Sequence, residues 1–116
     1  MTKSKRILLP AAAVALCLGA GFFYRMIHPR AVEASAVEVR IDNFSYTPTP
    51  LVVKSGTVIT WTNRDDIPHT VVEEENTFHS KVLDTDEKFT FTATKPGTYK
   101  YYCSIHPKMM AKVIVE

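Results

Sequence analysis

EKFTFTATKPGTYKYYCSIHPKMMAKVIVE (residues 87–116) is the stretch that decides the fold class, because strand-like runs alternate in it with turn residues. Pro96 and Gly97 turn the chain between the first two runs. Each run is rich in Val, Ile, Thr and aromatic residues, which favour β-strands. The three predicted strands cover residues 87–93, 97–103 and 112–116.

The same pattern continues upstream as far as Val37, and no segment of 37–116 shows helical periodicity. Two prolines make the segment 45–50 irregular in this prediction. About seven short strands with regularly spaced turns are typical of an all-β, Greek-key β-sandwich. The other predicted strands are 37–41, a run from Leu51 to the turn at Gly56, 57–63 and 69–74. Six aromatic residues are expected in core or cross-strand packing: Phe44, Trp61, Phe89, Phe91, Tyr99 and Tyr101.

The N-terminal segment has the features of an export signal. Residues 1–24 combine early positive charges with a long apolar run, and such a run approaches the roughly 20 residues that cross a bilayer as a helix. We therefore predict a hydrophobic helix at 1–24 acting as signal or membrane anchor, a tether at 25–36 and one folded domain at 37–116. The domain is expected in the periplasm or on the extracytoplasmic face of the membrane, with the N-terminal segment retained or cleaved.

The charge of the predicted domain argues against nucleic-acid binding. Residues 37–116 carry nine Lys and Arg against eleven Asp and Glu, so there is no excess of positive charge. Within the domain Cys103 is the only cysteine, and it cannot form an internal disulfide. A free thiol in an oxidising compartment needs another explanation, such as a bound metal.

Candidate metal ligands cluster around that cysteine. Cys103, His106 and Met109 follow the spacing Cys-x-x-His-x-x-Met between the last two predicted strands, and His69 follows Pro68 in a distant loop. Loops gather at the ends of a sandwich, so these side chains can meet there. Two imidazoles and a thiolate with a weak thioether ligand favour copper, whereas zinc prefers closed sets of Cys and His. Met110 competes with Met109 for the thioether position.

These motifs resemble those of the cupredoxins, and most closely the amicyanin, plastocyanin and pseudoazurin group. The resemblance lies in YTPTPLVVKSGTVITWTNRDDIPHTV (46–71), LDTDEKFTFTATKPGTYKYYCSIHPKM (83–109) and the closing KVIVE. Two positions depart from the common family pattern. Thr70 stands where Asn is frequent after the first ligand histidine, and Ile105 stands where related loops often have Pro.

The resemblance implies one mononuclear type 1 copper, with Met109 as the weak axial ligand beside His69, Cys103 and His106. It also implies a membrane-tethered or exported carrier that passes single electrons between redox proteins, with no enzymatic activity, no small-molecule substrate and no nucleic-acid partner. We expect the edge of His106 to be the electron port, ringed by Ile67, Pro68, Pro107 and Met110. Binding of Cu(I) for delivery, storage or resistance is the alternative function, because nothing in the ligand set excludes it.

Overall fold

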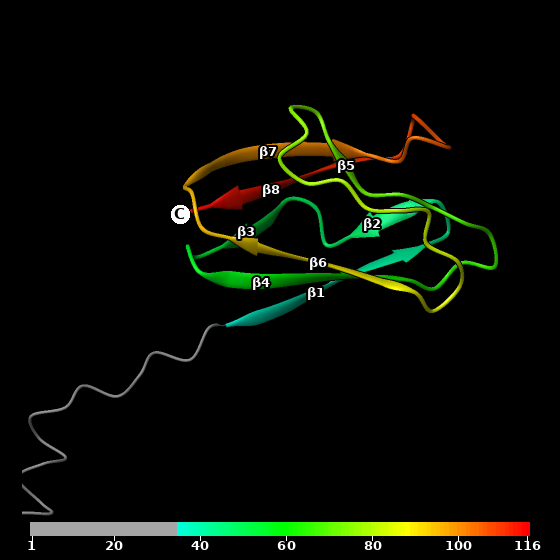
Figure 1. The fold of residues 1–116 in the computed structure, drawn as a ribbon, viewed down its shortest axis with the longest axis horizontal. Coiled ribbons are helices and arrows are strands. Elements are labelled where there is room, and N and C mark those ends of the chain that lie inside the picture. Colours follow the sequence, from blue (N-terminus) through cyan, green and yellow to red (C-terminus); the bar gives the residue numbers. More distant parts are fainter. Residues whose placement is uncertain (1–34) are drawn as a thin grey trace, which may run out of the picture. The chain divides into compact units, whose positions relative to one another are not determined.

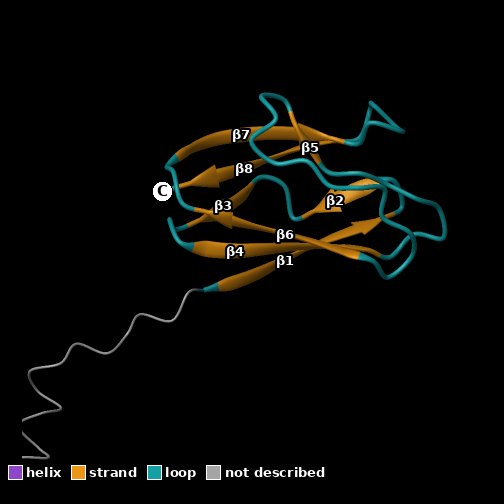
Figure 2. Ribbon diagram, viewed as in Figure 1, coloured by secondary structure: helices purple, strands orange, loops and turns teal. Residues whose placement is uncertain are grey.

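The computed structural model describes residues 35–116, and the predicted N-terminal helix at 1–24 lies outside them. The described chain forms eight strands joined by turns and loops (Figure 2). Within it no helix is long and apolar enough to cross a membrane. The strands are β1 (Ala36–Asp42), β2 (Ser45–Thr47), β3 (Leu51–Val53), β4 (Thr57–Asn63), β5 (Val72–Glu73), β6 (Lys88–Ala93), β7 (Gly97–Tyr102) and β8 (Met110–Val115).

The strands form two four-stranded sheets that face each other as a sandwich (Figure 1). One sheet has the order β2-β1-β4-β6 and the other the order β3-β8-β7-β5. Strands β1 and β4 pair in parallel, as do β3 and β8, while the remaining pairs are antiparallel. The chain crosses between the sheets at β3 and returns at β4, which makes the parallel pairing possible. The predicted all-β sandwich is therefore confirmed.

Two local predictions were wrong. The segment 45–50 was expected to be irregular, but Ser45–Thr47 pairs with β1 as β2, since the prolines begin only at Pro48 and leave three residues free to pair. The predicted strand at 69–74 shortens to Val72–Glu73. Its first residue, His69, instead makes an isolated bridge to Leu83.

Alternation along the strands builds the core between the sheets. Val39 and Ile41 of β1 and Ile59 and Trp61 of β4 are fully buried. Trp61 packs against three aromatic rings with centroid distances of 5.3–5.6 Å, those of Phe78, Phe89 and Tyr101. Burying a large apolar side chain stabilises a fold by about 1.5–3 kcal/mol, so this cluster gives the connecting loops a rigid base.

Candidate metal centre

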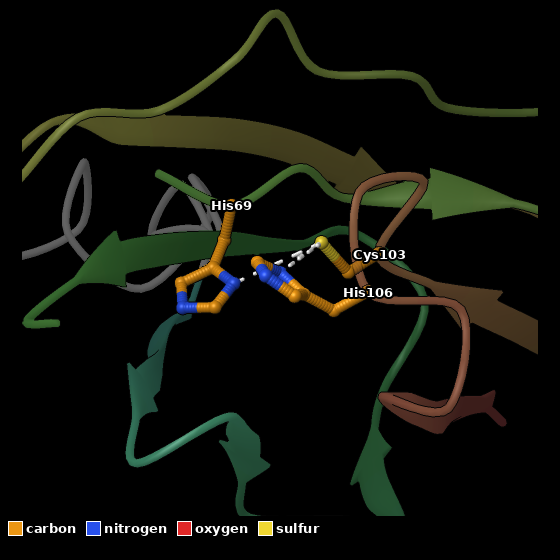
Figure 3. A group of neighbouring side chains, drawn as sticks. All are labelled: His69, Cys103 and His106. Carbon is orange, nitrogen blue, oxygen red and sulfur yellow. Dashed lines mark hydrogen bonds between the residues drawn. The ribbon is translucent and has the colours of Figure 1, made fainter. Parts of the chain in front are cut away.

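Three of the four predicted ligands meet at one end of the sandwich. His69 lies on the connection from β4 to β5, Cys103 directly follows β7, and His106 lies in the loop before β8. Figure 3 shows the three side chains converging. Their ligand atoms all lie within 4.8 Å of one another. Cys103 and His69 are fully buried, whereas His106 is half-buried.

The distances between the three side chains would allow them to bind one metal ion together. The Sγ atom of Cys103 lies 3.8 Å from Nδ1 of His69 and 3.8 Å from Nδ1 of His106. Bonds of about 2.3 Å to sulfur and about 2.0 Å to nitrogen place those atoms about 3.5–3.7 Å apart, so both distances are compatible with a metal ion bound between the sulfur and the nitrogens. Two imidazoles and a thiolate are the donor set of a blue-copper site.

Met109 belongs to the same loop and turns inward. Its backbone N–H donates to the carbonyl of His106 at 2.9 Å, and its carbonyl accepts from the N–H of Cys103 at 3.1 Å. Met109 is 5% exposed, while the neighbouring Met110 begins β8 and is 68% exposed. The loop is thus closed on itself with the Met109 thioether on the buried side, which favours Met109 over Met110 as the fourth ligand.

A buried carboxylate orients His69. Oδ2 of Asp65 lies 2.7 Å from Nε2 of His69. Because an ionised carboxylate can only accept, the ring carries a proton on Nε2, and this hydrogen bond holds the ring with Nδ1 facing the Cys103 sulfur. Burial opposes ionisation of Asp65, but hydrogen bonds from the backbone of Phe44 and Asn43 and from His69 outweigh it and lower its pKa. Sequence reasoning missed Asp65; the signal available to it was a carboxylate four residues before a ligand histidine.

The surroundings of the Cys103 sulfur favour its ionised form, the thiolate. Burial raises the pKa of the thiol. The backbone N–H of Thr70, which lies 3.4 Å from Sγ, and hydrogen bonds with His69 and His106 lower that pKa by a larger amount. The net pKa is about 6, compared with 9.0 for an ordinary cysteine. The ionised form that binds a soft metal is therefore the dominant form at neutral pH.

Thr70 joins the two ligand loops. Its Oγ1 accepts from the backbone N–H of Ser104 at 2.8 Å and shares a second hydrogen bond, also 2.8 Å long, with the Ser104 hydroxyl. Thr70 replaces the Asn that is frequent in the family, and these bonds show how its hydroxyl links the loop of His69 to the loop of Cys103.

The edge of His106 opens into an apolar recess, and its lining differs from the prediction. Of the four residues expected around the edge of His106, Pro107 lines this recess, whereas Ile67, Pro68 and Met110 do not. Phe44 was expected in packed structure but is 52% exposed and lies over the site. The recess has a volume of about 460 Å³ and is lined by Phe44, Ile105, His106, Pro107, Lys108 and Met109.

Comparison with known proteins agrees with this geometry. The family model of the cupredoxin-like domain matches residues 11–115. This chain belongs to the cupredoxins. Membership confirms the expected cofactor, one type 1 copper, which the donor set described above fits.

Proteins similar to this cupredoxin include an amicyanin, a purple cupredoxin and a nitrite reductase. An amicyanin from Paracoccus versutus is 33% identical over 90 residues, covering 73% of this chain and 68% of the amicyanin. The structure of a purple cupredoxin from Nitrosopumilus maritimus aligns with a TM-score of 0.66 and 32% identity, over 69% of this chain and 99% of that one. A copper-containing nitrite reductase from Thermus scotoductus aligns with a TM-score of 0.67 and 30% identity, over 78% of this chain but 26% of the reductase chain.

The two neighbouring methionines of this cupredoxin provide a matched test of which residue would supply the thioether ligand. Replacing Met109 with leucine is expected to raise the reduction potential by about 60 mV or more, equivalent to a tenfold change in the redox equilibrium, because a donor to the oxidised metal is lost. This substitution nearly conserves side-chain volume, so the free energy of unfolding should change by less than about 1.5 kcal/mol. Met110→Leu is the control and should leave the potential unchanged; equal effects of both variants in voltammetry would argue against Met109.

Proposed function

We propose that this chain is an electron carrier in which His69, Cys103, His106 and Met109 hold one copper ion. The observation that carries the proposal is the asymmetry of the site: the thiolate and His69 are buried, whereas His106 reaches an apolar recess at the surface. The bound metal would supply one-electron chemistry by alternating between Cu(II) and Cu(I). The protein keeps water from the buried ligands and exposes a single imidazole edge to a partner.

The recess around His106 suits brief docking with a redox protein. Its lining is mostly apolar, with the cation of Lys108 at the side. A small apolar surface buries enough area for recognition but too little for a long-lived complex, which a carrier must avoid. We infer that donor and acceptor approach the copper through this recess.

We propose no catalytic role for the domain. Nitrite reductases, as a family, place a histidine beside the copper cysteine to pass electrons to a second copper. Here the neighbours of Cys103 are Tyr102 and Ser104. The resemblance to the Thermus reductase covers about a quarter of that enzyme and concerns the shared sandwich.

The N-terminal segment would place the carrier outside the cytoplasm. Residues 1–24 are proposed as a membrane anchor or cleaved signal, followed by the tether at 25–36. An anchored protein should stay with membranes after a high-salt wash and be released by detergent. Recovery of a shortened, freely soluble chain from the periplasm would instead indicate cleavage.

Titration of the full-length protein with Cu(II), followed by repeated reduction and reoxidation, tests the proposed function. We expect intense visible absorption that saturates at one equivalent of copper and reversible voltammetry without metal loss. A colourless protein that binds Cu(I) and hands it to a chelating acceptor protein would instead support copper delivery, the alternative function.

A further inference from the structure

The turn between β1 and β2 is held by the same carboxylate that orients His69. Oδ1 of Asp65 accepts from the backbone N–H of Asn43 at 2.7 Å, and Oδ2 accepts from the backbone N–H of Phe44 at 3.1 Å. Oδ2 also binds Nε2 of His69 at 2.7 Å. One side chain, which is almost completely buried, therefore connects two segments more than twenty residues apart in the chain.

The conformation of this turn needs such support. Asn43 and Phe44 have φ angles of +49° and +56°, in the left-handed region. Asn tolerates that region, but a bulky residue such as Phe is disfavoured there and persists only where its surroundings impose it. The two hydrogen bonds that the backbone N–H groups of Asn43 and Phe44 donate to Asp65 provide that constraint.

The turn places the Phe44 ring against both candidate imidazole ligands. Its centroid lies 5.2 Å from that of His106 and 5.7 Å from that of His69, with interplanar angles of 88° and 86°. Edge-to-face contact of this kind is favourable. Because Phe44 is 52% exposed, hydrophobic burial alone does not explain its position.

The two histidines are oriented by different means. His69 has a hydrogen bond at Nε2, whereas His106 has none at Nε2 among residues 35–116, and its only such contact there is Nδ1 to the Cys103 sulfur. The orientation of the His106 ring therefore depends on packing, to which the rings of Phe44 and His69 contribute with centroid distances of 5.2 Å and 5.0 Å.

We propose that Asp65 is a positioning residue for both imidazoles, acting on His69 directly and on His106 through Phe44. This proposal deepens the proposed function, on which its relevance to copper rests, but the arrangement itself exists without metal. It predicts that loss of the Asp65 carboxylate changes the orientation of His106, a histidine that Asp65 does not contact.

NMR of the metal-free, full-length protein tests the positioning separately from copper chemistry. In Asp65→Asn we expect loss of the Phe44–His106 ring contacts and increased motion of the His106 ring, in addition to changes at His69. Asp66→Asn, the same change at an exposed neighbour, should change neither histidine. Unchanged His106 signals in Asp65→Asn would overturn the proposal, even if copper binding were weakened.

A second variant tests the role of the Phe44 ring separately from that of the turn. Phe44→Gly removes the ring but tolerates the left-handed backbone, so the turn and the fold should persist. We expect the His106 ring to become mobile while the bond between Asp65 and His69 remains. Val82→Ala, which shortens another half-exposed apolar residue, is the control. A His106 ring that stays fixed without Phe44 would contradict the proposal.

Competition with a Cu(I) chelator then measures whether the effects of Asp65 and Phe44 on copper affinity depend on each other. Changes in residues that orient metal ligands typically weaken metal affinity by about 10- to 100-fold. If Phe44 acts under the control of Asp65, the double variant Asp65→Asn/Phe44→Gly should bind only about as weakly as Asp65→Asn alone. Multiplication of the two single effects would show that the residues act independently and would overturn the proposal.

Discussion

Replacing Cys103 with serine is expected to abolish the intense visible absorption of the copper-loaded protein. The sulfur of Cys103 lies 3.8 Å from both histidine nitrogens and is the only soft anionic donor in the cluster. A serine hydroxyl stays protonated at neutral pH and offers hard oxygen, so both the charge-transfer transition and Cu(I) binding should be lost. We expect Cu(I) affinity to fall by more than about 100-fold, beyond the range seen for residues that only orient ligands.

Absorption spectra during copper titration and competition with a Cu(I) chelator measure these effects. The control is Cys17→Ser, which removes the other cysteine of the chain and should leave both measurements unchanged. If Cys103→Ser kept the visible band, sulfur ligation by Cys103 would be wrong and the centre would need a different ligand.

The metal-free protein is expected to become more stable as the pH rises from about 6 to 9. The folded state holds the pKa of Cys103 at about 6, compared with 9.0 for an ordinary thiol. A group whose pKa is lowered by folding stabilises the protein fully above the unfolded pKa, and that stabilisation is lost as the pH falls through the folded value. The difference corresponds to at most about 4 kcal/mol, a large part of the stability of a small domain.

Urea unfolding at several pH values, with a chelator present, measures this dependence. Cys103→Ser should remove most of the rise between pH 6 and 9, because it has no thiol to ionise. Asp65 acts in a different window, since its lowered pKa gives stability that is lost only as the pH falls below the ordinary range of a carboxyl group. A flat profile in the parent protein would mean that the folded state does not favour the thiolate.

Strand positions and candidate ligands could be predicted from local sequence. Alternation such as Val39 and Ile41 in β1 reports which face of a strand is buried, because successive side chains point to opposite faces. The close spacing of Cys103, His106 and Met109 likewise reports a shared loop, whose backbone closes on itself through Met109. Both signals involve residues within a few positions of one another.

The rest of the centre depends on pairing between distant segments. Phe44 lies over the histidines because β1 and β4 pair in parallel, which brings the turn after β1 beside the loop that carries Asp65. Thr70 forms a hydrogen bond with Ser104, which lies 34 residues later, because pairing between distant strands also brings their two loops together.

The β-sandwich, the likeness to cupredoxins and the candidate copper ligands could all be predicted from the sequence, since these follow from periodicity, residue type and short spacing. The tertiary structure was needed to find how the two imidazoles are oriented, which residues line the recess beside His106 and how the pKa of the thiol is lowered. Those properties arise from hydrogen bonds and ring contacts between loops. Sheet topology determines which loops are neighbours, and no single short segment of the sequence specifies that topology.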